Sequence, residues 1–316
     1  MTKQAVLLLA HGTIERAEQI PEYLRNMTGG RPMPQAAIEE IQRRYALIGH
    51  SPLTEITLEQ GRMVEAELAA SGLQVPVYVA MRNWRPTIPD VMAKMRADCV
   101  TEAAVLCLAP QFSRVSVGLC RSAVEANAAG LRIDFTESWA QHPLLIEAFA
   151  ERLFPAWTSL SAQTGAPVPV LFTAHSVPCR TVEDRAGQST DPYAEEARRT
   201  AALITEHVPE ISQWFFAFQS QGFSAVAGSK VAWLGPTVEE TLDAIAASDV
   251  RTLLLQPVGF LCDHLEILYD VDIYFRKYAA ERNLRLERPE SLNASATLAR
   301  AIADLARQGL ARLGNR

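Results

Sequence analysis

Two patterns of apolar residues alternate along the chain. Short continuous apolar runs occur at residues 5–10, 75–80, 103–108, 168–173, 214–218 and 251–257. Longer segments with apolar residues three or four positions apart occur at residues 54–70, 88–97, 115–129, 193–207 and 239–247. The short runs predict buried strands, and the longer periodicity predicts amphipathic helices. Because strands and helices alternate, the pattern favours an α/β fold with parallel sheets.

An internal similarity and the chain length both indicate two domains. Residues 6–11 read VLLLAH and residues 170–175 read VLFTAH, so one strand in each half ends in Ala-His. A match this short also fits chance, since apolar strands are common in α/β proteins. Independently, 316 residues exceed what a single core usually serves. We predict an N-terminal domain at 1–160, onto which a C-terminal helix at 294–316 packs back, and a C-terminal domain at 161–293.

Composition and charge exclude several classes of protein. With 48% hydrophobic and 21% charged residues, the chain resembles globular proteins and not disordered ones. A net charge of −6 provides no overall positive field for nucleic acid. No apolar run approaches the roughly 20 residues of a membrane span, and none has the form of a signal peptide. Five cysteines without a C-x-x-C pair are typical of reduced thiols, which predicts a cytoplasmic location.

The densest group of ionisable residues follows the last predicted strand. Asp263, Glu266 and Asp270 stand at positions i, i+3 and i+7, which places three carboxylates on one face of a helix. An ordinary helix start, with Asp263 as the N-cap and the other acids in solvent, explains this spacing equally well. The spacing alone therefore leaves both explanations open.

Two histidines stand at the ends of predicted parallel strands, where open α/β sheets bind ligands. They are His11 and His175, and a packed, purely structural histidine is a common alternative at such a position. Imidazole and carboxylate together suit Fe²⁺, Zn²⁺ or Co²⁺, and imidazole also accepts a proton near neutral pH. Phosphate-loop, nucleophile-elbow, zinc-helix and dinucleotide motifs are missing from the sequence. His175 and the acids at 263–270 are therefore a plausible set of groups for metal and protons, beside the structural explanation.

Six short motifs follow one another in an order and spacing typical of one enzyme family. They are IGHSPL at 48–53, AHSVP at 174–178, DPY at 191–193, QS at 219–220, WLGP at 233–236, and residues 257–272 with DHLE at the centre. With them, nearly the whole chain resembles the ferrochelatases, lyases that insert Fe²⁺ into a porphyrin in haem biosynthesis. The resemblance implies two Rossmann-like domains, each a parallel sheet flanked by helices, with a porphyrin cleft between them.

The resemblance also implies roles for the ionisable residues. His175 corresponds to the metal-facing histidine and Glu266 to the opposed carboxylate, so these two are the expected metal ligands and catalytic groups. Asp263 and His264 form the supporting pair of Glu266, and Asp270 extends an acidic path toward solvent. In this family the helix that carries these acids often widens into a π-helix. Which of His175 and Glu266 takes the pyrrole protons is open at this level.

Porphyrin contacts are implied by the same resemblance. Around the macrocycle it places Arg82, Trp233 and Phe260. Near the propionates it places Thr13, Arg31, Tyr45 and Ser51. His11 stands where many relatives have tyrosine or methionine, which makes an axial ligand to the iron of bound product a hypothesis for this chain.

Departures from the family limit what is expected of cofactors. Tyr274 stands where some relatives continue the acidic stripe, and Thr190 replaces a glycine, so we do not expect an outer metal site. Without a C-terminal cysteine cluster, no iron–sulfur cofactor is expected, and no cofactor is expected to be permanently bound. Fe²⁺ is a substrate in this interpretation.

The expected partners are the porphyrin, ferrous iron and neighbouring enzymes of haem synthesis, with no nucleic acid and with the chain as a monomer. The ring is coproporphyrin III or protoporphyrin IX, which differ at the rim. Two other functions stay open: a cobalt chelatase acting on sirohydrochlorin, and a porphyrin carrier without catalysis.

Overall fold

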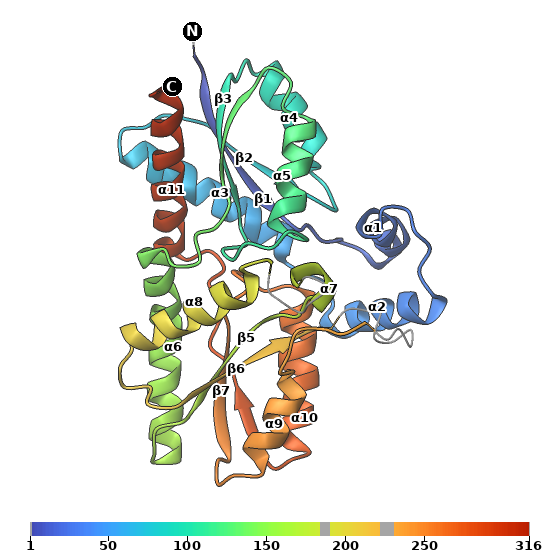
Figure 1. The fold of residues 1–316 in the computed structure, drawn as a ribbon, viewed down its shortest axis with the longest axis vertical. Coiled ribbons are helices and arrows are strands. Elements are labelled where there is room, and N and C mark those ends of the chain that lie inside the picture. Colours follow the sequence, from blue (N-terminus) through green and yellow to red (C-terminus); the bar gives the residue numbers. More distant parts are fainter. Residues whose placement is uncertain (1, 184–189, 222–230, 316) are drawn as a thin grey trace. The chain divides into compact units, whose positions relative to one another are not determined.

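The chain folds into two compact units. The computed structural model describes residues 2–183, 190–221 and 231–315. Unit 1 contains Met1–Met33, Pro52–Leu145 and Asn293–Arg316, and unit 2 contains Pro34–Ser51 and Ile146–Leu292. Each unit is built on a four-stranded parallel sheet (Figure 1). The α/β class with two parallel sheets, as the apolar pattern predicts, is confirmed.

The sheet of unit 1 has the order β2-β1-β3-β4. Its strands are β1 (Gln4–Ala10), β2 (Val77–Met81), β3 (Glu102–Cys107) and β4 (Arg132–Thr136). Its helices are η1 (Ala17–Gln19), α1 (Ile20–Met27), α3 (Leu53–Ala70), α4 (Ile88–Ala97), α5 (Val117–Ala126) and α11 (Ala296–Gly314). Helix α4 contacts β2 and α5, whereas α11 contacts β3, β4 and α3, so helices cover both faces of the sheet (Figure 1).

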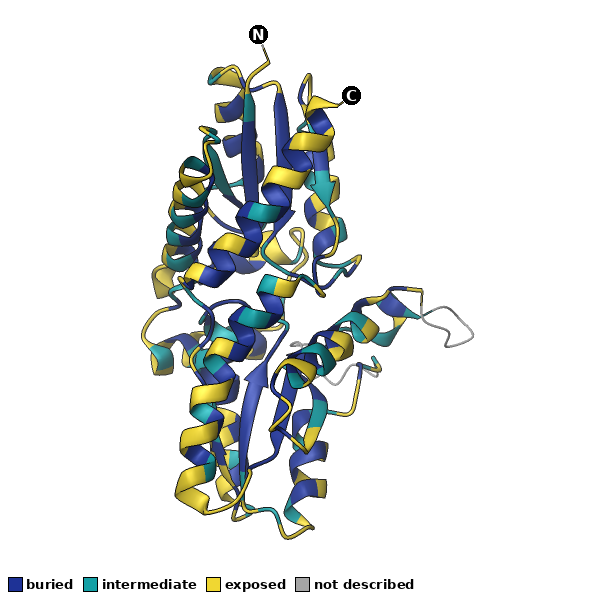
Figure 2. Ribbon diagram, turned by 90° about the vertical axis from the view of Figure 1, so that its left-hand side faces the viewer, coloured by how far each residue is buried: buried dark blue, intermediate teal, exposed yellow. Residues whose placement is uncertain are grey.

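The core of unit 1 explains why these segments fold as they do. Leu7 and Leu9 of β1 point to one face of the sheet and pack in a cluster with Met92 of α4. On α11, a Cβ atom at Gly309 would lie 2.9 Å from the Cβ of Ala104, so glycine lets this helix approach β3 closely. Figure 2 shows the strands buried and the outer faces of the helices exposed.

The sheet of unit 2 has the order β6-β5-β7-β8. Its strands are β5 (Val170–His175), β6 (Trp214–Gln219), β7 (Thr252–Pro257) and β8 (Arg285–Glu287). Its helices are α2 (Gln35–Ile48), α7 (Cys179–Val182), α8 (Tyr193–His207), α9 (Val238–Ala246), the π-helix η2 (Glu266–Phe275) and α10 (Arg276–Ala280). Leu253 and Leu255 of β7 pack in one cluster with Leu242 of α9 and Ile267 of η2. This cluster fixes η2 against the sheet.

The bounds of the units differ from the expected 1–160 and 161–293. Helix α6 (Pro143–Thr164) runs without interruption through the position where unit 1 gives way to unit 2, at Leu145. The expected boundary near residue 160 therefore falls inside this helix. Residues 34–51 belong to unit 2, although this segment lies within the N-terminal half of the chain. The C-terminal helix α11 is part of unit 1.

Membrane and redox features complete the description. Over the part of the chain that the structure describes, we find no helix with the length and apolar character of a membrane span. All five cysteines are free thiols. A cytoplasmic location and a monomeric state stay predictions.

Candidate active site

His175 is the last residue of β5, and three contacts orient it. Its ring Nδ1 lies against the carbonyl oxygen of Ser176. Because a carbonyl oxygen only accepts, Nδ1 carries the proton and Nε2 keeps its lone pair. The hydroxyl of buried Tyr193 donates to the His175 carbonyl oxygen at 2.8 Å, and burial raises the pKa of Tyr193, which keeps that hydroxyl protonated. The arrangement leaves Nε2 as a base or metal ligand.

A second histidine and an aromatic ring connect His175 to the start of η2. Phe260 meets the His175 ring edge-on at a centroid distance of 6.0 Å and lies 4.3 Å from the ring of His264. His264 is buried, and its Nδ1 binds the carbonyl oxygen of Cys262 at 2.9 Å. Its Nε2 lies 3.2 Å from Glu266 Oε2, within ion-pair distance but without hydrogen-bond geometry. His175, His264 and Glu266 therefore belong to one cluster.

Asp270 is the buried acid of this cluster, with 4% of its surface exposed. Its Oδ1 lies 3.0 Å from Arg44 Nη1, and its Oδ2 accepts a hydrogen bond from Ser220. Burial raises the pKa of Asp270 to about 6; Arg44 and Ser220 oppose the rise and the charge of Glu266 adds to it. Ser220 has a φ of 60°, a conformation that serine rarely adopts, so its backbone is strained where it holds this acid.

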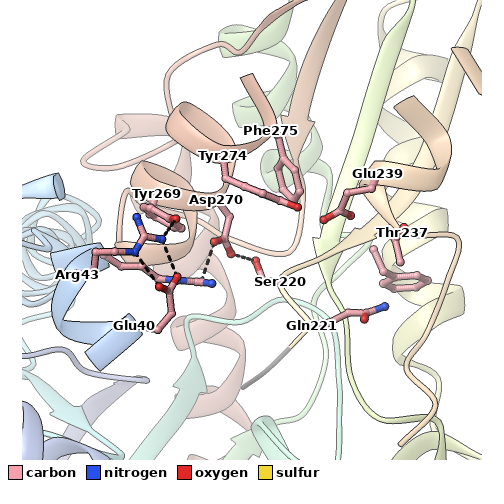
Figure 3. Close-up of a pocket in the computed structure, with 12 residues that line it drawn as sticks. Glu40, Arg43, Ser220, Gln221, Thr237, Glu239, Tyr269, Asp270, Tyr274 and Phe275 are labelled. Carbon is pink, nitrogen blue, oxygen red and sulfur yellow. Dashed lines mark hydrogen bonds and ion pairs between the residues drawn. The ribbon is translucent and has the colours of Figure 1, made fainter. Parts of the chain in front are cut away.

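A pocket of about 490 Å³ opens onto Asp270 within unit 2. It is lined by Glu40, Arg43, Arg44, Phe218, Ser220, Gln221, Thr237, Glu239, Tyr269, Asp270, Tyr274 and Phe275. Figure 3 shows Tyr274 extending toward Glu239, and burial, together with the nearby charge of Glu239, raises the pKa of Tyr274 to about 12. On the opposite side, Arg43 holds the pKa of Glu40 at about 2. The pocket thus carries charges of both signs around one buried acid.

The two arginines of the pocket are held in place by an aromatic ring. The guanidinium carbons of Arg43 and Arg44 lie 5.3 Å and 4.7 Å from the centroid of the Tyr269 ring. Arg43 also donates to the Tyr269 hydroxyl, and both arginines bind Glu40 at 2.8 Å. This packing orients Arg44 toward Asp270.

Of the expected macrocycle contacts, Phe260 is part of the cluster and Trp233 lies close to it in the fold. Trp233 forms a backbone bridge with Pro178, three residues after His175. Among residues 2–183, 190–221 and 231–315, no hydrogen-bond partner exists for the buried ring nitrogen of Trp233 or for the buried hydroxyl of Ser51. Tyr45 is buried on α2, and its carbonyl oxygen accepts from Gly49.

In unit 1, His11 and Arg82 lie at the ends of neighbouring strands. His11 follows β1 and is exposed, and its Nε2 is 3.1 Å from the amide nitrogen of Asn83. Arg82 follows β2; its backbone N–H donates to Ala10, and its Nη1 donates to the carbonyl oxygen of Val115 at 3.1 Å. The structure therefore brings His11 and Arg82 to one edge of the sheet.

The remaining two expected contacts have different surroundings. Thr13 is buried, and its carbonyl oxygen accepts from Thr54 at 3.5 Å. Arg31 is exposed after α1, and its Nε donates to the carbonyl oxygen of Thr28 at 3.0 Å. The grouping of Thr13 and Arg31 with His11 and Arg82 at the porphyrin stays a prediction.

Several functional side chains were not found from the sequence. Arg44 lies 226 positions from Asp270, and nothing in its local sequence indicates the ion pair. Ser220 and Tyr193 belong to motifs of the family resemblance, but their contacts with Asp270 and His175 follow only from the fold. No pattern in the sequence marks Arg288, which binds Asp263 and Asp272.

The cluster offers donors for a metal ion in transit. Within the described ranges, no group of three or more His, Cys, Asp or Glu side chains is arranged to hold a metal ion. The imidazole of His175 and the carboxylate of Glu266 are nevertheless donors that suit ferrous iron. His175 and Glu266 therefore suit a metal ion whose remaining ligands come from the substrate that receives the ion.

Comparisons with known proteins agree with this chemistry. A family model described as Ferrochelatase matches residues 3–310. A ferrochelatase of Acidobacterium capsulatum is 51% identical over 98% of this chain and 96% of that protein. A coproporphyrin III ferrochelatase of Mycolicibacterium vanbaalenii is 33% identical over 96% of this chain and 89% of that protein. The solved structure of SirB from Bacillus subtilis with Fe³⁺ covers 100% of this chain and 98% of its own at a TM-score of 0.59, and its 15% identity makes this a likeness of fold.

Proposed function

This chain belongs to the ferrochelatase family, and we propose that it inserts Fe²⁺ into a porphyrin with release of two protons, in haem biosynthesis. The free ring has two pyrrole N–H groups that must lose their protons, and hydrated iron must lose water. The reaction therefore requires both a base and a metal ligand. In this proposal His175 is the base, and Glu266 is the carboxylate that exchanges with the water of the incoming ion.

The observation that carries the proposal is the orientation of His175. With Nδ1 bound to the Ser176 carbonyl oxygen, the basic Nε2 is available to a ligand. The first pyrrole N–H bond breaks with its proton going to Nε2, which passes that proton on before it accepts the second. In both steps the electron pair stays on the nitrogen that binds iron. His264 supports Glu266 from 3.2 Å, and Asp263 supports the start of η2. His175 and Glu266 are thus the metal-binding and proton-handling pair.

Protons leave the site through Asp270 and the pocket in front of it. Asp270 interacts electrostatically with His175 and Glu266, and a pKa of about 6 lets its carboxyl group gain and lose a proton near neutral pH. The pocket connects this carboxyl group to solvent within unit 2. Glu239, which lines the pocket with Tyr274, supplies a carboxylate on the outer side, where some relatives carry an acid on η2 itself.

The porphyrin contacts follow the same proposal. Phe260 and Trp233 provide apolar surface for the macrocycle. The buried hydroxyl of Ser51 has no hydrogen-bond partner among the described residues and is available to a propionate. Arg82, Arg31, Tyr45 and Thr13 complete the set assigned from the family resemblance. His11 is proposed as a ligand to the iron of the product, because its exposed ring lies at the end of β1.

The test is anaerobic metal insertion by the purified protein, with Fe²⁺ and Co²⁺ each offered against coproporphyrin III, protoporphyrin IX and sirohydrochlorin. We expect Fe²⁺ insertion into at least one of the two porphyrins. The porphyrin with the higher insertion rate identifies the rim substituents that this chain recognises. Faster turnover of sirohydrochlorin with Co²⁺ would contradict the proposal. Tight porphyrin binding without turnover would indicate a carrier instead.

A further inference from the structure

A largely buried arginine binds two carboxylates at the π-helix. Arg288 follows β8, and its side chain is 10% exposed. Its Nε and Nη2 each lie 2.7 Å from an oxygen of Asp272, and Nη2 also lies 3.1 Å from Asp263 Oδ1. The Ser291 hydroxyl donates to the same Asp263 oxygen at 2.7 Å. One guanidinium therefore joins two acids that are nine positions apart in the sequence.

These two acids flank the residues that carry the chemistry. Asp263 precedes η2 (Glu266–Phe275), Asp272 lies inside it, and Glu266 and Asp270 stand between them. A π-helix closes its hydrogen bonds from i to i+5, so each residue turns less about the axis than in an α-helix. If the segment relaxed to an α-helix, Asp272 would rotate away relative to Asp263. The planar fork of Arg288 could then no longer hold both carboxylates.

The other contacts of η2 act on its apolar face and on Asp270. Ile267, Val271 and Phe275 pack into an apolar cluster, which tolerates small rotations because such contacts are non-directional. Asp270 is held by Arg44 and Ser220. The contact of Arg288, by contrast, spans from the loop before η2 to its second half.

We propose that Arg288 is a positioning residue that keeps η2 in its π-helical form and thereby keeps Glu266 and Asp270 aimed at the site of metal insertion. The inference rests on the proposed function. A positioning role of Arg288 differs from a general stabilising role, because loss of the π-helical geometry of η2 lowers turnover while leaving porphyrin binding intact.

The test compares Arg288→Gln and Arg288→Lys with Arg276→Gln as the matched control. Arg276 lies 4.0 Å from the same Asp272 but is 43% exposed and pairs mainly with Glu287 at 3.1 Å. In Arg288→Gln we expect kcat to fall about 10- to 100-fold with KM for porphyrin within about twofold, as for a misplaced catalytic group. Lysine keeps the charge but not the fork, so we expect it to restore little of the loss. The control is expected to retain wild-type turnover.

Amide hydrogen exchange across residues 266–275 provides a readout that does not depend on activity. We expect faster exchange in Arg288→Gln and no change in Arg276→Gln. Should Arg288→Gln fail to fold, Asp272→Asn removes only the contact inside η2 and is expected to give the same split between kcat and KM. Full rescue by Arg288→Lys, unchanged kcat in a folded variant, or equal losses in the control would each overturn the inference. A wild-type protein without insertion would contradict the proposed function instead, and the exchange data would still decide about Arg288.

Discussion

His11 and His175 follow equivalent apolar strands of the two units but have different surroundings. His11 is exposed after β1 and meets the amide of Asn83 and the edge of the Tyr23 ring. His175 is fixed by a backbone carbonyl, by the hydroxyl of Tyr193 and by Phe260. The position at a strand end is therefore the same, and the chemistry depends on what later strands and helices place beside it. The acids of η2 follow β7 and have His175 as their neighbour.

The largest contrast is expected when each histidine is removed in turn. In His175→Ala we expect metal insertion to fall by about 10²-fold or more, the usual contribution of a positioned general base. His11→Ala is expected to keep turnover within a few-fold of wild type. Fluorescence quenching would measure porphyrin binding, which should survive in both because Phe260 and Trp233 remain. Near-normal insertion by His175→Ala would show that His175 is not the catalytic member of the two histidines.

The buried acid near His175 predicts a dependence of stability on pH. Asp270 has a folded pKa of about 6, above its ordinary value of 3.8, so between these values the folded state holds a proton that the unfolded state has lost. Its contribution to stability is therefore complete below pH 3.8 and is lost as the pH rises through 6. Relative to Asp270→Asn, the wild-type free energy of unfolding should fall by about 3 kcal/mol from pH 3.5 to 7.5.

Urea unfolding of both proteins at several pH values measures this difference. Asp249→Asn serves as the control, because Asp249 is exposed and lies outside the site. A difference between wild type and Asp270→Asn that stays constant with pH would show that Asp270 titrates as an ordinary carboxyl group.

A smaller effect is expected from the group that holds His175 by its backbone. Tyr193→Phe removes only the hydroxyl that donates to the His175 carbonyl oxygen. We expect a loss of about 1 kcal/mol in the free energy of unfolding, the usual value of one such hydrogen bond, with a modest drop in kcat. Thermal unfolding and steady-state rates measure both. An unchanged kcat with the full loss of stability would mean that Tyr193 supports the fold but not the orientation of His175.

The smallest effect on rate is expected from His11→Phe, which should change the absorption spectrum of bound iron porphyrin and leave insertion within about twofold, since only a product ligand is lost. Phenylalanine keeps a ring beside Tyr23, so packing is preserved. An unchanged spectrum would identify His11 as a packing residue and leave His175 as the functional member of the pair.

The sequence predicted the fold where the apolar pattern is long and regular. Residues 88–97 and 193–207 form helices with those bounds, and the apolar runs at the central positions of both sheets form strands. Strands β4 and β8 were missed, because β4 is only partly buried and β8 has three residues. A short or partly exposed strand carries little hydrophobic signal, since few of its side chains are buried.

The candidate site was predictable as far as local position determines it. His175 and Glu266 follow strands at the edge where parallel sheets bind ligands. Arg44, Ser220 and Arg288 were not predictable, because their partners are distant in the sequence and the pairing exists only after the helices pack. The π-helical form of η2 was implied by the family resemblance and is confirmed; spacing alone fits an α-helix equally well.

The place of α11 in unit 1 has a consequence for synthesis on the ribosome. The sheet strands of unit 1 are translated first, but the helix that covers β3 and β4 is encoded after the whole of unit 2. Until residues 293–316 leave the exit tunnel, β3 and β4 lack the helix that covers them on this face of the sheet. Unit 2 can complete its core earlier, so the order of folding on the ribosome runs opposite to the order of the two sheets in the chain.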